Sequence, residues 1–115
     1  GTYDRNRHFY TTMSPSMDIL ISSNLERLLY TVAGAEKTAA YMRALGTDGK
    51  YTVDADVKAK IDESFLGYFC DEELTKKTIR DTFDTDHYLC DTHTAVGRRA
   101  RRRAQDRACL DGKPL

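Results

Sequence analysis

Four consecutive polar residues, Asp91-Thr92-His93-Thr94, place a carboxylate, an imidazole and two hydroxyls just before a long helix-forming stretch. The unpaired N–H groups and the positive end of a helix favour negative charge there. An imidazole changes protonation near neutral pH. The group could therefore line a site for an anionic or ionisable ligand. The alternative is that Asp91 or Thr92 is an ordinary helix cap and His93 a surface residue, and spacing alone favours this alternative.

A second polar group surrounds the short apolar run 19–21. Its members are hydroxyl and amide side chains: Ser14, Ser16, Ser22, Ser23 and Asn24. Pro15 predicts a turn at Ser14, because proline fixes its own φ and restricts the residue before it. Such groups on a turn and at a helix N-terminus suit an anion or a polar small molecule. Capping and turning alone would also explain them.

Residues 23–26 fit a capping box. We expect the Ser23 hydroxyl to accept from the N3 amide while Glu26 reaches back to the Ser23 N–H. Asp18 and Arg27 are interpreted as structural, with Arg27 paired to a neighbouring acid.

Both polar stretches resemble motifs of one enzyme family. Residues 14–27, Ser-Pro-Ser-Met-Asp-Ile-Leu-Ile-Ser-Ser-Asn-Leu-Glu-Arg, resemble a segment of the threonine synthases. Residues 91–97, Asp-Thr-His-Thr-Ala-Val-Gly, are similar to that family's Asp-Pro-His-Thr-Ala-Val-Gly, with Thr92 in place of the more usual proline. Residues 1–4 resemble the family's lead-in to the first motif. The resemblance covers nearly the whole chain and is weakest from Ala35 to Asp86.

The resemblance implies a parent enzyme that uses pyridoxal phosphate to convert O-phosphohomoserine and water to threonine and phosphate. It implies that the wall of the cofactor pocket includes Asp91, His93 and Thr94. It more weakly implies substrate contacts from Ser14, Ser16, Ser23 and Asn24. No catalytic residue and no metal ligand is expected within the chain. The expected partners are the remainder of the enzyme and its substrate, without nucleic acid or membrane, in the cytoplasm.

Two parts of a pyridoxal enzyme have no counterpart here. These are the Schiff-base lysine and the glycine-rich loop that holds the phosphate, both of which precede this segment in the family. The element that meets the pyridine nitrogen follows it. The chain's lysines all lie in polar helical or turn contexts. We therefore expect a segment of a larger α/β enzyme that, alone, binds no cofactor and is inactive.

The spacing of apolar residues, together with the capping residues and glycines between them, predicts a mainly α-helical single segment over residues 1–115. Minor extended pieces are also expected. Five short helices are expected at 24–33, 35–45, after Asp54, 72–83 and 92–107. Gly34 and Gly46 are the expected stops of the first two. Asp54 and Asp71 are expected caps. Short extended segments are expected at 1–12, 51–53 and 87–90.

The same periodicity predicts which side chains face inward. We expect Val57 and Ile61 inside on the third helix, and Leu74, Ile79 and Phe83 on the fourth. On the last helix the expected seam is made of small residues at i, i+4 spacing: Val96, Ala100, Ala104 and Ala108.

The composition limits the domain count, the kinds of cysteine site and the partners that the chain can have. The chain has 115 residues, enough for one domain, and 18 basic against 18 acidic residues. The three cysteines, Cys70, Cys90 and Cys109, have no metal-site spacing and suit free thiols in a reducing compartment. Six arginines between Arg98 and Arg107 leave one alternative open, a non-catalytic helical module that binds acidic partners or nucleic acid. No aromatic residues alternate with these arginines, which favours a solvated helix face.

Overall fold

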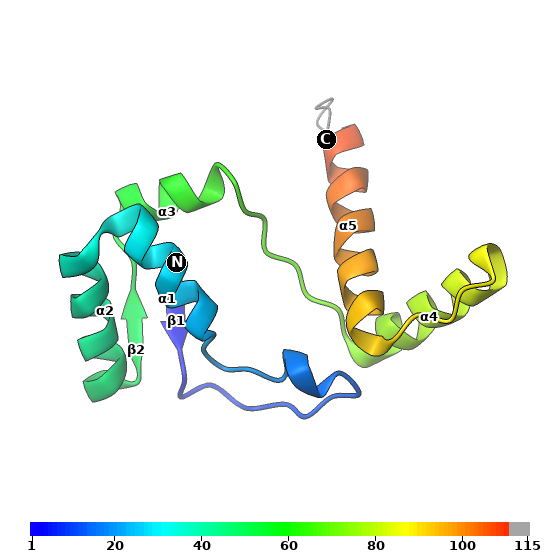
Figure 1. Ribbon diagram of the computed structural model, residues 1–115, viewed down its shortest axis with the longest axis horizontal. Helices are drawn as coiled ribbons and strands as arrows, with labels where there is room; N and C mark the ends of the chain where they lie inside the picture. Colours follow the sequence, from blue (N-terminus) through cyan, green and yellow to red (C-terminus); the bar gives the residue numbers. More distant parts are fainter. Residues whose placement is uncertain (111–115) are drawn as a thin grey trace. The chain divides into compact units, whose positions relative to one another are not determined.

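The computed structural model describes residues 1–110 and forms two compact units. The first combines Gly1–Tyr10 with Ile19–Phe65, and the second combines Thr11–Asp18 with the chain from Leu66 onward. The described chain contains five α-helices, one 3-10 helix and two short strands (Figure 1). The predicted mainly helical class with minor strands is confirmed.

The first unit is a helical layer with a two-stranded ribbon. Its helices are α1 (Ser23–Ala33), α2 (Ala35–Asp48) and α3 (Ala55–Asp62). Strands β1 (Thr2–Asp4) and β2 (Lys50–Thr52) pair antiparallel, with Tyr3 opposite Tyr51 (Figure 1). Residues 1–12, expected to be extended, thus begin with a true strand.

An apolar core holds this unit together. Leu29 is fully buried among Tyr41, Tyr51, Val53 and Val57. The Tyr51 ring stacks on the Tyr41 ring, with centroids 5.5 Å apart. Burial raises the pKa of Tyr51 to about 12. The prediction that Val57 faces inward is confirmed, and Ile61, also predicted, packs against the same cluster.

The predicted capping box of α1 is wrong, and the cap lies one residue earlier than expected. Ser22, not Ser23, is the N-cap, and its hydroxyl accepts from the Asn24 N–H at 3.3 Å. Two adjacent serines offer the same chemistry, so the sequence did not distinguish them. The predicted end at Gly34 is confirmed, because Gly34 has φ +85° and its N–H bonds the Tyr30 carbonyl.

The predicted stop of α2 at Gly46 is also wrong, since the helix continues to Asp48 and ends at Gly49. Gly49 has φ +73°, the left-handed region that glycine adopts without strain. The last carbonyls are satisfied from the N-terminal segment. Asn6 donates its amide to the Asp48 carbonyl at 3.1 Å, and the Arg5 N–H bonds the Gly49 carbonyl at 2.8 Å. These long-range partners decide where the helix ends.

Asp54 occupies the N-cap position of α3, as predicted, but its side chain makes no capping bond. Its carboxylate pairs instead with the Lys37 ammonium at 2.8 Å, and Asp56 joins them at 3.2 Å. Hydrogen bonds to the two carboxylates raise the pKa of Lys37 to about 12. The bonds to Lys37 lower the pKa of both acids. This ion group links α2 to α3.

The second unit contains the 3-10 helix η1 (Pro15–Met17), α4 (Glu72–Asp86) and α5 (Thr92–Leu110). Helices α4 and α5 pack on each other (Figure 1). Asp71 caps α4 as predicted, since its carboxylate accepts from the Leu74 N–H at 2.8 Å. The helix ends at His87, which has φ +52°. Residues 88–90 are irregular rather than a strand.

The predicted inward face of α4 is confirmed only in part, since Leu74 and Ile79 of this helix are half-buried. Its buried residues are Thr75, Thr78 and Thr82, whereas Phe83 is 49% exposed. Each buried hydroxyl donates to a carbonyl four residues earlier, at 2.7 to 2.8 Å. A threonine whose hydroxyl is satisfied in this way can be buried like an apolar residue. The apolar pattern therefore missed the most buried residues of the helix.

The predicted seam of α5 is confirmed in part, since Val96, Ala100 and Ala104 are all half-buried. Ala95 is the fully buried residue at its start, and Val96 is only half-buried. Ala108 lies outside the residues whose side chains are described, as does Cys109. Cys70 and Cys90 are free thiols.

Within residues 1–110, none of the helices combines the length and apolar character that a bilayer crossing requires. The same residues contain no cluster of three or more His, Cys, Asp or Glu side chains suited to a metal ion.

Candidate functional site

Inside the second unit, a hydrogen bond joins the first residue of the motif at 14–27 to the motif at 91–97. The Ser14 hydroxyl and Nδ1 of His93, 79 positions apart in the sequence, form this bond. Ser14 is only 3% exposed, so the contact is shielded from solvent. Two polar stretches that sequence analysis could treat only separately therefore share one surface of this unit.

The turn that carries Ser14 is fixed by polar bonds on both sides. The Glu72 carboxylate, in the first turn of α4, accepts from the Met13 N–H at 2.8 Å. The Thr12 hydroxyl accepts from the Ser14 N–H at 3.0 Å and donates to Asp18 at 2.7 Å. Asp18 is therefore structural, as interpreted from the sequence. Glu72 and Thr12 were not predicted to act here, because their contacts depend on how α4 meets the turn.

His93 is held by the first turn of α5. The Asp91 carboxylate accepts from the N–H groups of His93 and Thr94, at 2.9 and 3.0 Å. Its other oxygen accepts from the Thr94 hydroxyl at 2.7 Å. The hydroxyl and N–H of Thr94, followed by the N–H of His93, lower the pKa of Asp91. Asp91 therefore stays ionised and caps the helix.

Thr92 stands where the resembling family usually has proline, and it is the first residue of α5. Proline is favoured at that position because its missing N–H would be unpaired anyway and its φ suits a helix. Threonine also occupies this position without preventing the helix from beginning there.

The bond to Ser14 decides which atom of His93 can meet a ligand. Nδ1 is engaged by the Ser14 hydroxyl, and Nε2 has no hydrogen-bond partner among the described residues. A neutral imidazole carries its proton on one nitrogen, and the Ser14 hydroxyl can donate to Nδ1 or accept from it. Nε2 is therefore the ring nitrogen that remains to bond a ligand.

The other predicted site residues separate between the two units. Ser16 is exposed on η1, next in the chain to the buried Ser14 turn. Ser23 and Asn24 are exposed at the start of α1, in the first unit. The predicted ion pair of Arg27 is wrong, since its guanidinium donates to the Asn24 side-chain oxygen at 3.4 Å instead.

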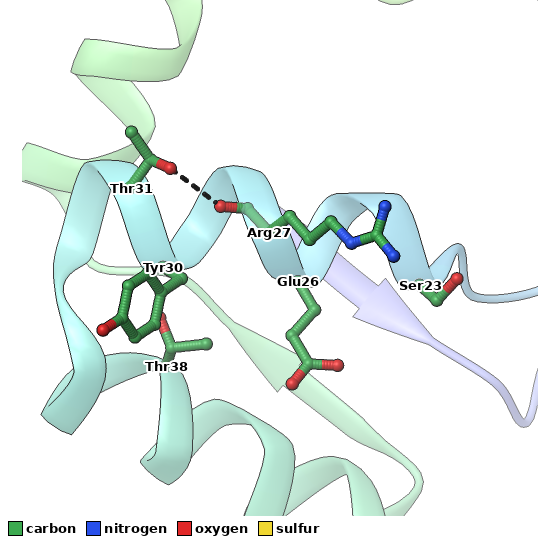
Figure 2. Close-up of a pocket in the computed structure, with 6 residues that line it drawn as sticks. All are labelled: Ser23, Glu26, Arg27, Tyr30, Thr31 and Thr38. Atoms are coloured by element: carbon green, nitrogen blue, oxygen red, sulfur yellow. Dashed lines mark hydrogen bonds between the residues drawn. The ribbon is translucent and has the colours of Figure 1, made fainter.

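Ser23 lines a pocket of about 500 Å³ in the first unit. Its other lining residues come from α1 and α2 (Figure 2): Glu26, Arg27, Tyr30, Thr31 and Thr38. Neither Tyr30 nor Thr38 was predicted from the sequence to line a site. Both residues line the pocket because α1 and α2 lie next to each other. Neither residue type indicates this pairing in the sequence.

The arginine-rich face of α5 has partners within the second unit. Arg98 pairs with Asp86 of α4. The Thr85 hydroxyl and then Arg98 lower the pKa of Asp86. The Arg103 guanidinium lies 5.9 Å from the centre of the Phe69 ring, a cation–π distance. These arginines thus serve packing in part.

Comparisons with known proteins agree on one family, although no family model matches the chain. Threonine synthase of Saccharomyces cerevisiae is 35% identical over 112 residues, which cover 84% of this chain and 22% of the relative. Human threonine synthase-like 1 is 36% identical over 95% of this chain and 15% of its own length. Threonine synthase of Pseudomonas aeruginosa is 34% identical over 87% of this chain.

Solved structures give the same result. The crystal structure of threonine synthase from yeast superimposes with a TM-score of 0.83 and 35% identity, covering 90% of this chain and 23% of that one. The pyridoxal-phosphate-bound threonine synthase of Brucella melitensis gives 0.84 and 34% identity, covering 22% of that chain. The chain thus spans about a fifth of the length of these enzymes, or less in the human relative.

Proposed function

The chain belongs to the threonine synthase family, and on that premise we propose that it forms one wall of the ligand pocket in such an enzyme. The proposed parent reaction converts O-phosphohomoserine and water to threonine and phosphate. The bond between Ser14 and His93 carries the proposal, because it joins the start of the motif at 14–27 to the motif at 91–97 within the second unit. A cytoplasmic location belongs to the same proposal.

We assign the pocket wall to Asp91, His93 and Thr94. Asp91 and Thr94 bond each other and fix the start of α5, so they position His93. His93 then presents Nε2 to the cofactor or substrate. Weaker substrate contacts are proposed for Ser14, Ser16, Ser23 and Asn24. Ser14 acts through His93, since its buried hydroxyl is already bonded to that ring.

Pyridoxal phosphate is the proposed cofactor, by analogy with the Brucella enzyme whose structure contains it. The group supplies an electron sink when bound. The donor set of this chain suits the edge of its pocket, because the imidazole has one available nitrogen and the Asp91 carboxylate already caps the helix beside it. The parts that anchor the cofactor, a lysine and a phosphate loop, are assigned to the rest of the enzyme.

The test is substitution of His93 by glutamine in the full-length enzyme. We expect the rate of threonine formation to fall at least tenfold while the far-ultraviolet circular dichroism spectrum stays unchanged. His8→Gln is the matched control, because His8 is exposed and in the first unit. Equal rates for the two variants would contradict the proposed role.

The alternative is a helical interaction module that binds acidic partners through α5. The contacts of Arg98 with Asp86 and of Arg103 with Phe69 favour the enzyme, because they occupy part of that face. Retention of the chain on heparin at near-physiological salt, falling steeply with added salt, would support the module. We expect weak retention that disappears with modest salt.

A further inference from the structure

The turn that carries Ser14 is closed by its own hydrogen bonds. The Asp18 carboxylate accepts from the Thr12 N–H at 2.8 Å and from the Thr12 hydroxyl at 2.7 Å. Between these ends, the Met17 N–H bonds the Ser14 carbonyl at 2.8 Å. Local bonds of this kind limit the conformations of residues 12–18, so an anchor on one of these residues also restrains Ser14.

Hydrogen bonds connect this turn to both helices of the second unit. On α5, His93 bonds the Ser14 hydroxyl. On α4, the Glu72 carboxylate accepts from the Met13 N–H at 2.8 Å. Met13 directly precedes Ser14, so the two anchors hold neighbouring residues. Glu72 therefore restrains, from α4, the backbone beside the hydroxyl that meets the imidazole on α5.

Glu72 has a plainer explanation, because acidic side chains in the first turn of any helix are favoured by its dipole. The two neighbouring acids, however, already make the local bonds at the start of α4. Asp71 accepts from the Leu74 N–H at 2.8 Å, and Glu73 pairs with Lys76 at 2.9 Å. Glu72 instead bonds an N–H 59 positions earlier in the chain, and it is half-buried where both neighbours are exposed. The contact with the turn, rather than the start of the helix, explains its direction.

We propose that Glu72 is a positioning residue for His93. Its carboxylate fixes the Met13 backbone, and the adjacent Ser14 hydroxyl is thereby held against Nδ1 of the imidazole. The inference rests on the proposed function, because it gives Glu72 a part in presenting Nε2 to the ligand. Glu72 itself is assigned no contact with substrate or cofactor. A misplacement of about 1 Å in a positioned group can cost much of a reaction rate.

The test measures kcat/KM for threonine formation in the full-length enzyme. Glu72→Ala removes the acceptor of the Met13 N–H and should lower kcat/KM about three- to tenfold, the cost of one lost hydrogen bond. Glu72→Gln keeps an oxygen at the same reach and should restore most of the rate, since an amide oxygen also accepts from an N–H. Glu73→Ala should leave kcat/KM unchanged. It is the matched control, because Glu73 is an exposed acid in the same helical turn.

Equal losses in Glu72→Ala and Glu73→Ala would overturn the inference, because the effect would then belong to the helix start. Equal losses in Glu72→Ala and Glu72→Gln would overturn it as well, because the bond to Met13 would not be the cause.

A second background shows whether the effect passes through Ser14. In an enzyme that already carries Ser14→Ala, adding Glu72→Ala should cost less than about twofold, because its route to His93 is gone. An undiminished loss in that background would indicate a general structural role and would overturn the inference. Full activity of His93→Gln would overturn the proposed function and this inference with it. Full activity of Glu72→Ala beside a slow His93→Gln would overturn this inference alone.

Discussion

The two units of this chain bury different kinds of side chain. The first encloses Leu29, Val57 and stacked tyrosines, as an independent apolar core does. The second encloses threonine hydroxyls and Ser14, while Phe69 and Leu89 are each 71% exposed. A unit that buries hydroxyls and exposes large apolar groups gains little from the hydrophobic effect. The contrast suggests that the first unit supplies stability and the second supplies positioned polar atoms.

The largest effect is expected from Leu29→Ala in the first unit. Leu29 is fully buried, so the lost contacts and the cavity should cost about 3 kcal/mol of unfolding free energy. Urea unfolding measures this cost. The control is Leu66→Ala in the second unit, where the side chain is 63% exposed and the change should stay below about 0.5 kcal/mol. Similar costs for both variants would remove the contrast between the units.

A reciprocal exchange at buried positions sharpens the comparison. Val57→Thr would place a hydroxyl in the apolar core and should cost about 1–3 kcal/mol. Thr82→Val removes a hydroxyl that only bonds its own helix, to the Thr78 carbonyl, and should change stability by less than about 1 kcal/mol. Thermal unfolding of the two variants checks the order. A larger cost at Thr82 would mean that its hydroxyl is essential to the second unit.

Backbone conformation gives a matched pair within the first unit. Gly49→Ala should destabilise by about 1–3 kcal/mol, because a Cβ there would lie 2.6 Å from the Asn6 side chain at a positive φ. Gly34→Ala meets open space at a similar φ and should cost less. Chemical unfolding compares them directly. Equal costs would show that φ alone, and not the contact with Asn6, makes glycine necessary at 49.

The smallest effect concerns pH and the start of α5. The pKa of Asp91 is lowered in the folded chain, so its contribution to stability is present above the ordinary carboxyl pKa. It is lost as the pH falls through the lowered value. We expect Asp91→Asn to flatten the acid side of the stability profile, measured by unfolding at several pH values. An unchanged profile would show that Asp91 does not act through its charge.

The sequence predicted the elements better than their faces. Local signals placed the caps at Asp71 and Gly34, because the bonds they make lie within a few residues. The end of α2 at Gly49 depends on Asn6, more than forty residues earlier in the chain. The sequence around the helix could not show this contact, so the first glycine, Gly46, was predicted as the stop. The threonine face of α4 was missed because bonds to the helix's own carbonyls satisfy the hydroxyls. Polarity alone could not show this.

For the candidate site too, the sequence predicted some residues but not the contacts between distant segments. Motif resemblance selected both Ser14 and His93, and the structure adds the bond between them. Glu72 was not among the predicted site residues, although its carboxylate accepts from the Met13 N–H of the Ser14 turn. The sequence could not show this contact, because it depends on how two segments 59 positions apart meet.

A double-mutant cycle on Ser14 and His93 in the full-length enzyme tests the central claim most directly. The measured quantity is kcat/KM for threonine formation in Ser14→Ala, His93→Gln and the double variant. Because the two side chains share a hydrogen bond, we predict that the double variant loses less than the sum of the single losses, by about 1 kcal/mol or more. Strictly additive losses, or no loss in either single variant, would contradict the claim that these residues form one site.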